Sequence, residues 1–292
     1  MQRRQFLFGL AASALLSACG SLPQSSDPTP TTPRRKPRVG LALGGGAAKG
    51  FAHVGVIKIL EAQGIFPDII TGTSAGSVVG ALYAAGYSGV QLQELSFALD
   101  ESRFRDFSIG NGGLIRGQKL EDYVNQQLKK RPIEKLKRPF AAVATDLDSG
   151  RKVIFQRGNT GQAVRASSSV PGVFEPVLIQ GRRYVDGGLV SPVPVDAARD
   201  LGADIVIAVD ISSKANNGKP DGTLSILEQT FTIMGQKIGE SELSRADVVL
   251  RPAVGTMGST EFERKHSAIL EGEKAALAAL PLIRQKLGLP RR

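Results

Sequence analysis

Apolar residues fall into short runs that alternate with amphipathic segments along most of the chain. The run Val39–Leu43 is apolar or glycine throughout, as expected for a strand buried on both faces. After it, apolar residues recur every three or four positions, at Val54, Ile57 and Leu60, which predicts a helix that Gly64 ends. The same patterns predict strands over 69–70, 140–145, 152–155, 177–179, 183–185, 204–210 and 248–250, and helices over 51–63, 78–85, 90–99, 120–129, 162–166, 224–245 and 261–287.

Strand, glycine loop and helix follow one another repeatedly from Arg38 onward. This order indicates an α/β domain with a largely parallel sheet. Short strand pairs over 140–155 and 177–185 are joined by glycine turns, which predicts two hairpins. Because no internal repeat or second linker is visible, a single domain over 38–292 is expected.

The first 37 residues have a different pattern. Arg3-Arg4, the apolar run Phe6–Leu16 and the closing Leu16-Ser17-Ala18-Cys19 have the layout of a signal peptide over 1–18, too short for a membrane span. The closing tetrapeptide resembles a bacterial lipobox, which predicts that Cys19 is lipidated, and the arginine pair resembles a twin-arginine export signal. Residues 19–37 are rich in Ser, Thr and Pro and read as a tether. We therefore expect a membrane-anchored lipoprotein, on the periplasmic face of the outer membrane in a diderm bacterium.

Composition and charge limit the classes of binding partner that we expect. A chain of 292 residues with 41% hydrophobic residues can bury a substantial core, and its single cysteine excludes an intrachain disulfide. The net charge is +10, and the domain after the tether keeps an excess of basic residues. A basic domain suits an anionic membrane or lipid. Nucleic acid is not expected as a partner, because aromatic residues make up only 5% and no basic-aromatic motif appears.

A candidate nucleophile lies between the second predicted strand and the helix after it. Gly72-Thr73-Ser74-Ala75-Gly76 has the pattern G-x-S-x-G. When a strand reverses directly into a helix the backbone is crowded, and glycines on either side relieve the clash while the serine is exposed at the carboxyl end of the sheet. This context makes Ser74 a candidate for nucleophilic catalysis.

A glycine loop follows the first predicted strand. Backbone N–H groups of Gly44-Gly45-Gly46-Ala47 can converge on one spot and would suit the oxyanion of an acyl-transfer intermediate. A dinucleotide site uses a similar loop, but the acidic residue expected at the end of the second strand is replaced by Ser74. The oxyanion interpretation is therefore favoured.

The base for Ser74 stays open at this point. A Ser-His-Asp triad would need His53 or His266, which are the only histidines. His53 lies one turn into a predicted helix, where a buried histidine in a structural role is usual, whereas His266 follows in a chain order known for hydrolases. The other candidate is the carboxylate of Asp186, which begins Asp186-Gly187-Gly188 after a predicted strand and can equally belong to a plain turn.

Four blocks taken together resemble the patatin-like phospholipase family, in particular its bacterial branch related to neuropathy target esterase. The resemblance covers about residues 38–195. In chain order the blocks are Gly44–Gly50, Gly72–Gly76, Arg165–Phe174 and Asp186–Leu189.

The resemblance implies a three-layer α/β/α sandwich and a Ser-Asp dyad, with Ser74 as nucleophile and Asp186 as base. It implies that the oxyanion is held by the glycine loop, chiefly by Gly45, Gly46 and Ala47, and that no metal or organic cofactor is used. The expected activity is hydrolysis of fatty-acyl esters of phospholipids or lysophospholipids. Further motif residues are Lys49, Gly50, Gly72, Gly76, Gly187 and Gly188.

Two residues depart from the family pattern. Lys49 stands where arginine is more frequent, which keeps the charge but loses the bidentate fork. Ser191 stands where many relatives carry asparagine, and we expect looser local hydrogen bonding there.

The sequence leaves three functions possible, and it does not decide which residues form the wall of the acyl pocket. The alternatives to a phospholipase are a carboxylesterase or thioesterase on soluble esters, and a non-catalytic lipid-binding envelope protein. An acyl pocket is expected, and the helix over 224–245 can line it with Phe231, Ile233 and Met234, although ordinary core positions are the favoured interpretation of these three residues.

Overall fold

The computed structural model describes residues 35–100, 106, 113–213 and 222–290. Residues from Pro37 to Arg292 form one compact unit. The expected signal peptide, Cys19 and most of the tether lie outside the described residues. Within the described part of the chain, no helix is both long and apolar enough to cross a bilayer.

An eight-stranded mixed sheet forms the centre of this unit, with the strand order β5-β6-β3-β2-β1-β7-β8 and β4 paired to β3. From β3 to β8 along this order the neighbouring strands run parallel, and β4, β5 and β6 add antiparallel pairs. Both predicted hairpins are confirmed, as β3–β4 and β5–β6. The strands are β1 (Val39–Leu43), β2 (Ile69–Thr73), β3 (Phe140–Asp146), β4 (Lys152–Phe155), β5 (Val177–Ile179), β6 (Arg182–Asp186), β7 (Ile205–Val209) and β8 (Val248–Leu250).

The central strands are buried on both faces, as their unbroken apolar runs predict. In β1, Leu41 and Leu43 belong to the larger core cluster, whereas Ala42 packs in the cluster on the opposite face. In β7, Ile207 and Ala208 divide in the same way, because successive side chains of a strand point to opposite faces.

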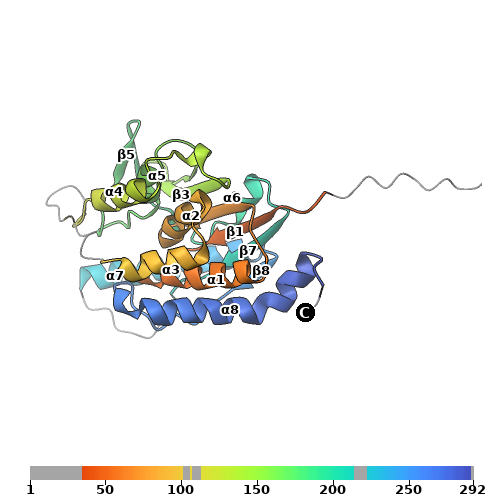
Figure 1. Cartoon of the computed structure of the whole chain (residues 1–292). Helices are drawn as coiled ribbons and strands as arrows, with labels where there is room; N and C mark the ends of the chain where they lie inside the picture. The colour runs from red at the N-terminus through yellow and green to blue at the C-terminus, as the bar shows by residue number, and fades with distance from the viewer. Residues whose placement is uncertain (1–34, 101–105, 107–112, 214–221, 291–292) are drawn as a thin grey trace, which may run out of the picture. The chain divides into compact units, whose positions relative to one another are not determined.

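Helices cover both faces, which confirms the expected α/β/α architecture. The larger core cluster takes residues from α1, α2 and α8, and the other cluster takes residues from α6 and the end of α7. Figure 1 shows α8 alongside α1, and α4 beside α5. The helices are α1 (Phe51–Ala62), α2 (Ala75–Ala85), α3 (Gly89–Ala98), α4 (Gln118–Gln127), α5 (Thr160–Ser167), α6 (Val195–Asp200), α7 (Thr223–Leu243) and α8 (Lys265–Lys286), with short 3-10 turns η1 (Ala47–Gly50), η3 (Ile133–Lys135), η4 (Gly187–Leu189) and η5 (Phe262–Arg264).

Two helix predictions need correction. α2 begins at Ala75, three residues before the predicted start, because the helix follows Ser74 without an intervening loop. α6 was not predicted, since its six residues are too few to carry a helical period.

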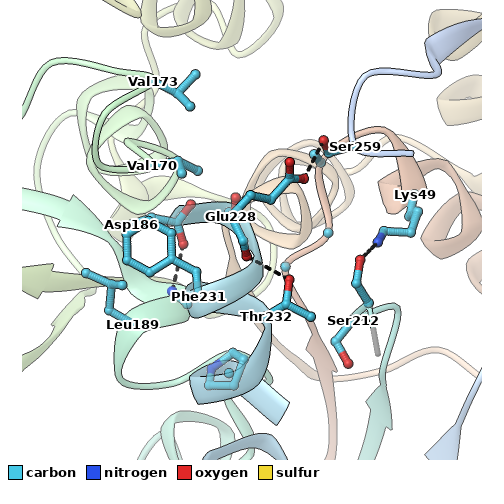
Figure 2. Close-up of a pocket in the computed structure, with 18 of the residues that line it drawn as sticks. Lys49, Val170, Val173, Asp186, Leu189, Ser212, Glu228, Phe231, Thr232 and Ser259 are labelled. Atoms are coloured by element: carbon cyan, nitrogen blue, oxygen red, sulfur yellow. Dashed lines mark hydrogen bonds between the residues drawn. The ribbon is translucent and has the colours of Figure 1, made fainter. Parts of the chain in front are cut away.

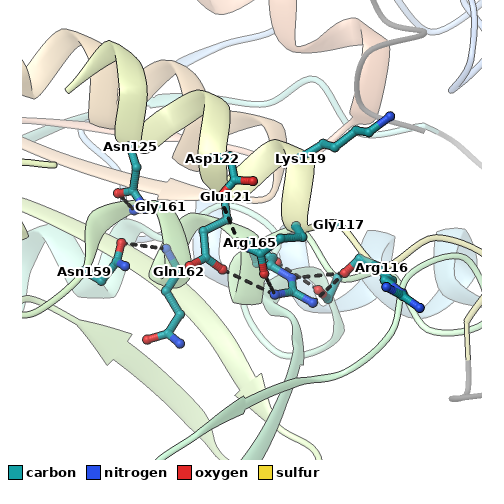
Figure 3. Close-up of polar contacts among 12 residues, drawn as sticks. Arg116, Gly117, Lys119, Glu121, Asp122, Asn125, Asn159, Gly161, Gln162 and Arg165 are labelled. Atoms are coloured by element: carbon teal, nitrogen blue, oxygen red, sulfur yellow. Dashed lines mark hydrogen bonds and ion pairs between the residues drawn. The ribbon is translucent and has the colours of Figure 1, made fainter. Parts of the chain in front are cut away.

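An arginine joins α5 to α4 and to the segment before it. The Arg165 guanidinium donates to the Arg116 carbonyl through Nε and Nη2, to Gln118 Oε1 at 2.8 Å and to Glu121 Oε2 at 3.3 Å (Figure 3). Both side chains of the Arg165–Glu121 pair are largely buried. Since a buried guanidinium is stable only when it is paired, this cluster fixes α5 against α4.

Candidate active site

Strand pairing brings Ser74 and Asp186 together. β2 runs parallel to β3 and ends at Thr73, which pairs with Val143. β6 runs antiparallel to β3, and its last residue Asp186 pairs with Ala144, the next residue of β3. Because β4 pairs with residues 142–145 of β3, it occupies the other edge of that strand, and β2 and β6 share one edge. Two strands therefore approach from opposite directions and end facing each other, with Ser74 and Asp186 at the junction.

The turn at Ser74 is strained and crowded, as the G-x-S-x-G pattern predicts. Ser74 has φ 53° and ψ −126°, a positive φ that a residue with a side chain rarely adopts. A Cβ on Gly76 would lie 2.1 Å from the Leu43 carbonyl oxygen, and a Cβ on Gly72 would lie 2.4 Å from the Gly76 carbonyl oxygen. Only glycine fits at these two positions, so the strand can turn into α2 and leave Ser74 at the pocket surface.

The segment after α5 connects both candidate catalytic residues. The Ser74 N–H donates to Ser167, to Oγ at 3.0 Å and to the carbonyl oxygen at 3.1 Å, and the Ser167 hydroxyl donates to Val143 O. The Asp186 N–H donates to the Ser169 carbonyl at 2.9 Å. The sequence identified 165–174 as a family block but did not assign this supporting role to Ser167 and Ser169.

Asp186 is buried, and its two carboxylate oxygens differ in their hydrogen bonding. The residue is 5% exposed, and its Oδ1 accepts the Gly188 N–H at 2.7 Å. Its Oδ2 has no hydrogen-bond partner among the described residues. Burial raises the pKa of Asp186 to about 6, against smaller lowering effects of the Ser74 hydroxyl and the Gly188 N–H. The Ser74 hydroxyl is thus the near neighbour of this carboxyl group, without a hydrogen bond of regular geometry. Hydrogen bonds between catalytic groups are often loose in an unliganded site, so this contact suits a general base for Ser74. Because the pKa of Asp186 is raised to about 6, this base is ionised above about pH 6.

The glycine loop supplies fewer oxyanion donors than the sequence suggests. The Gly44 N–H donates to Val209 O and the Gly45 N–H donates to Pro192 O, both at 3.0 Å. Gly44 and Gly45 therefore anchor the loop, and their predicted role as donors is wrong. The N–H groups of Gly46 and Ala47 make no hydrogen bond with described residues, and Ala47 has a positive φ of 49°.

A third donor position was not predicted. The N–H of Ala75, the residue directly after Ser74, also has no acceptor among the described residues. It lies at the N-terminus of α2, where the first N–H groups of a helix are free and favour negative charge. Gly46, Ala47 and Ala75 are consequently the candidate oxyanion donors.

Neither histidine lies where a triad base would be needed. His53 is fully buried in α1, and its Nε2 bonds the Gly44 carbonyl at 2.8 Å, which fixes the glycine loop. Burial lowers the pKa of His53 to about 4, so the ring is neutral at pH 7. His266 is an exposed residue of α8 that stacks on Phe97, and it does not line the pocket at Ser74. The triad with His266 is therefore contradicted.

The other predicted motif residues lie around the same junction. A Cβ on Gly187 would lie 2.1 Å from Val143 O, so this position admits only glycine. Gly50 is buried against Ala75, and Gly188 donates to Asp186. Lys49 is buried in η1, and its Nζ donates to Ser213 Oγ.

A pocket of about 480 Å³ opens over Ser74 and Asp186. Figure 2 shows Val170, Val173, Leu189 and Phe231 on the side of Asp186, and Lys49 and Ser212 on the other side. Phe231 lines the pocket, which corrects the expectation that it is an ordinary core residue. Ile233 and Met234 are neither core nor lining residues, because their side chains are 50% and 47% exposed on the outside of α7.

The described residues at this site include no cluster of metal-ligating side chains. The part of the chain that the structure describes contains no group of three or more His, Cys, Asp or Glu side chains arranged to hold a metal ion.

The model of the family described as patatin-like phospholipase matches residues 41–199, a range that contains the Ser74 turn, the glycine loop and Asp186. The chain belongs to the patatin-like phospholipase family. It is 39% identical over 203 residues to an uncharacterised NTE family protein of Mycobacterium tuberculosis, covering 66% of this chain and 55% of that protein. It is 30% identical over 284 residues to lysophospholipase NTE1 of Pyricularia oryzae, covering 86% of this chain and 19% of that protein. The chain thus spans about half of the mycobacterial relative and a fifth of the fungal one.

Two solved structures share the patatin-like fold. VipD from Legionella pneumophila superposes with a TM-score of 0.59 and 13% identity, covering 84% of this chain and 67% of that one. The type III effector protein ExoU has a TM-score of 0.50 and 15% identity, covering 88% of this chain and 54% of that one. At these identities the likeness concerns the fold alone.

The residue that departs from the patatin-like pattern after Asp186-Gly187-Gly188 is not loosely held. The Ser191 hydroxyl donates to Glu242 Oε1 at 2.5 Å, and the Ser191 carbonyl accepts the Thr73 hydroxyl at 2.7 Å. The second Glu242 oxygen accepts the Val193 N–H at 3.1 Å. The expectation of looser hydrogen bonding is therefore wrong. Glu242, on α7 and 51 positions away, gave no sequence signal for this contact.

Glu242 connects α7 to the segment 191–193, which in turn contacts the glycine loop and the end of β2. The segment 191–193 that it holds also accepts the Gly45 N–H at Pro192 and the Thr73 hydroxyl at Ser191. Glu242 is 3% exposed, and burial raises its pKa to about 7. A folded-state pKa above the ordinary value of 4.5 means that this group stabilises the fold less as the pH rises from about 4.5 through 7.

We expect Glu242→Leu to lower the free energy of unfolding by about 2–4 kcal/mol, because the Ser191 hydroxyl and the Val193 N–H would be buried without an acceptor. Glu242→Gln keeps two polar atoms at this place and should lose less than half as much. Denaturant unfolding at pH 6 and pH 8 checks both, and Glu242→Gln should also reduce the pH dependence. Equal losses in the two variants would contradict the role given to these hydrogen bonds.

Proposed function

We propose that the protein is a serine hydrolase that cleaves fatty-acyl esters of phospholipids or lysophospholipids through the Ser74–Asp186 dyad. The observation that carries this proposal is the meeting of the two residues at one edge of β3. There, a buried carboxylate oxygen of Asp186 with no hydrogen-bond partner in the described part of the chain lies next to the strained Ser74. Membership of the family and the lysophospholipase name of the fungal relative support the substrate class.

In the first half of the reaction Ser74 Oγ attacks the ester carbonyl, and its proton passes to Asp186 Oδ2. The negative charge that develops on the carbonyl oxygen is held by the N–H groups of Gly46, Ala47 and Ala75. When the tetrahedral intermediate collapses, the ester C–O bond breaks, the leaving alkoxide takes the proton from Asp186, and the acyl group stays on Ser74.

In the second half a water molecule attacks the acyl-serine while Asp186 accepts its proton. The same N–H groups hold the second oxyanion. Collapse releases the fatty acid, Ser74 Oγ regains its proton from Asp186, and the site returns to its first state. The apolar part of the pocket, with Val173, Leu189 and Phe231, is suited to the acyl chain.

A substrate panel tests this function. The protein is assayed on lysophospholipid, diacylphospholipid and short p-nitrophenyl esters, each with the Ser74→Ala variant as control. We expect release of fatty acid from the phospholipid substrates and none with Ser74→Ala. Hydrolysis of the short esters alone would favour a carboxylesterase or thioesterase. Absence of all hydrolysis, with no fluorophosphonate labelling of Ser74, would leave a lipid-binding protein.

We also propose that Cys19 is lipidated and anchors the protein to the cell envelope, on the basis of the sequence pattern around it. The Cys19→Ala variant should then move from the membrane fraction to the soluble fraction. Fractionation of cells that express each form, followed by immunoblotting, measures this. Unchanged membrane association of Cys19→Ala would contradict lipidation as the anchor.

A further inference from the structure

The segment 191–194 contacts both halves of the candidate active site. Its Pro192 carbonyl accepts the N–H of Gly45, which directly precedes the candidate oxyanion donors of the glycine loop, at 3.0 Å. Its Ser191 carbonyl accepts the hydroxyl of Thr73, the last residue of β2 before the nucleophile, at 2.7 Å. Together with the pairing of β1 and β2, these two hydrogen bonds set the position of the glycine loop relative to the nucleophile.

Two prolines prevent this segment from holding itself in place by regular secondary structure. Pro192 and Pro194 have no N–H group, so Val193 carries the single N–H between them. Val193 is 1% exposed, and a buried N–H group needs an acceptor. Glu242 Oε2 accepts it at 3.1 Å, while Glu242 Oε1 accepts the Ser191 hydroxyl. The position of the segment therefore depends on one carboxylate of α7.

Glu242 is itself firmly placed at the end of α7. The next residue, Leu243, packs in the same core cluster as Val193. Beyond the helix, Arg245 donates to both carboxylate oxygens of Asp196 on α6, at 2.6 and 2.8 Å. Because α7 is joined in this way both to the segment and to α6, its last turn is a fixed support for the glycine loop.

We propose that Glu242 is a positioning residue for the reaction at Ser74, which acts through the segment 191–194 to hold the N–H groups of Gly46 and Ala47 at the place where the oxyanion forms. The inference rests on the proposed function. Glu242 is not one of the described residues that line the pocket, so it acts through the segment and not on the substrate. Since the oxyanion charge develops only as the serine attacks, misplaced donors slow the chemical step more than they weaken substrate binding.

The hydrogen bonds of Glu242 can persist in both of its protonation states. In the described part of the chain, the charged groups that face it are Lys152 from β4, Asp196 from α6 and Arg245 after α7. Burial raises the pKa of Glu242 to about 7, and among these charges Lys152 lowers it and Asp196 raises it. A neutral carboxyl group still accepts the backbone N–H with one oxygen, while its O–H donates to Ser191 Oγ. Protonation therefore reverses one hydrogen bond without releasing the segment.

The first test compares two substitutions of Glu242 in the full-length protein. Initial rates on p-nitrophenyl butyrate are measured at pH 8, at a temperature at which circular dichroism shows each variant to be folded. Glu242→Leu removes the acceptor of the Val193 N–H and the Ser191 hydroxyl, and it should lower kcat by about 10- to 100-fold with KM changed by less than about threefold. Glu242→Gln, which resembles the neutral carboxyl group, should keep kcat within about threefold of the native value. Full kcat in Glu242→Leu, or an equal loss in both variants, would overturn the proposal.

Asp247→Leu is the matched control for a general loss of stability. Asp247 Oδ2 accepts the Val206 N–H at 2.8 Å and the Arg199 guanidinium at 2.6 Å, near the start of β7 and away from the carboxyl ends of the strands. This substitution also removes a carboxylate that holds a backbone N–H. The unfolding temperature should fall, whereas kcat should stay within about twofold. A loss of kcat as large as in Glu242→Leu would show that activity follows stability alone and would overturn the proposal.

Ser191→Ala keeps the proposal testable if Glu242→Leu does not fold. It removes one of the two hydrogen bonds to Glu242 and keeps the Ser191 carbonyl that accepts the Thr73 hydroxyl. We expect kcat to fall by about 3- to 10-fold. An unchanged kcat in Ser191→Ala would overturn the proposal.

The pH profile distinguishes positioning from acid–base catalysis by Glu242. Because Asp186, with a pKa of about 6, is the proposed base, the acid limb of kcat/KM should have its midpoint near 6 in the native protein and in Glu242→Gln. A native midpoint near 7 that moves to about 6 in Glu242→Gln would show that ionisation of Glu242 enters the reaction. That result would overturn its assignment as a positioning residue.

Covalent labelling separates this inference from the dyad. A fluorophosphonate should label Ser74 about 10- to 100-fold more slowly in Glu242→Leu than in the native protein, because phosphonylation also needs the oxyanion donors. Labelling at equal rates would overturn the role of Glu242 and leave the dyad intact, whereas absence of labelling in the native protein would overturn the dyad.

Discussion

Replacing Asp186 by asparagine is expected to lower kcat by about 10³-fold or more on any ester that the protein hydrolyses. The amide cannot accept the Ser74 proton, and general-base catalysis accounts for effects of this order. The side chain keeps its size, so the Gly188 N–H still has an acceptor. Initial rates on a p-nitrophenyl ester and on lysophospholipid measure the loss.

The pKa of Asp186 adds a second readout to this variant. Since its pKa is raised to about 6, kcat/KM of the native protein should fall as the pH drops below about 6.

The ionised carboxylate of Asp186 is buried at a cost in stability, because its folded-state pKa lies above the ordinary value of 3.8. Stability from this group is thus present at low pH and lost as the pH rises through 6, by at most about 3 kcal/mol. Asp186→Asn should therefore unfold at an equal or higher temperature than the native protein at pH 8, with no gain at pH 4.

The matched control for Asp186→Asn is His266→Ala. His266 lies on α8 and stacks on Phe97, so its loss should leave most of the turnover. If His266→Ala abolished hydrolysis while Asp186→Asn kept it, a histidine would be the base and the dyad would be wrong.

Adding one methyl group to the glycine loop should also have a large effect. A Cβ on Gly46 would lie 2.8 Å from Ile211 Cδ1 and 2.9 Å from the Ile211 carbonyl oxygen, so Gly46→Ala has to shift the loop. The N–H groups of Gly46 and Ala47 would then move away from the oxyanion. Loss of one such donor typically lowers kcat by about 10²- to 10³-fold, and we expect a change of this size with KM changed much less.

Gly255→Ala is the control for this substitution. A Cβ on Gly255 meets nothing within 4 Å, so the same chemical change is made in open space. Rates and thermal unfolding of both variants distinguish a local effect from misfolding. If Gly46→Ala kept full kcat with a normal unfolding temperature, these N–H groups would not hold the oxyanion.

Much of the fold follows from local patterns in the sequence. Buried strands such as β1 and β8 lie at their predicted residues, because a short unbroken apolar run is typical of a strand buried on both faces. The turn at Ser74 also follows from the sequence, since only glycines at positions 72 and 76 allow the close approach of α2 to β1 and β2.

The parts that the sequence did not predict depend on contacts between distant segments. The Gly45 N–H is occupied because it donates to the carbonyl oxygen of the distant Pro192. Ser191 is firmly held because its hydroxyl donates to the distant Glu242. Ala75 was missed as a donor because every residue except proline has an N–H group, and only the hydrogen bonds around it reveal that its N–H has no acceptor among the described residues. His266 illustrates the same limit, because chain order alone could not place it on the outside of α8.

The most direct test of the Ser74–Asp186 account is covalent labelling with a fluorophosphonate, followed by peptide mapping by mass spectrometry. The account predicts that one adduct forms on Ser74 of the native protein, that hydrolysis is lost in proportion to labelling, and that Asp186→Asn labels far more slowly. Full hydrolysis by protein whose Ser74 is completely labelled, or an adduct on another residue that alone abolishes activity, would contradict it.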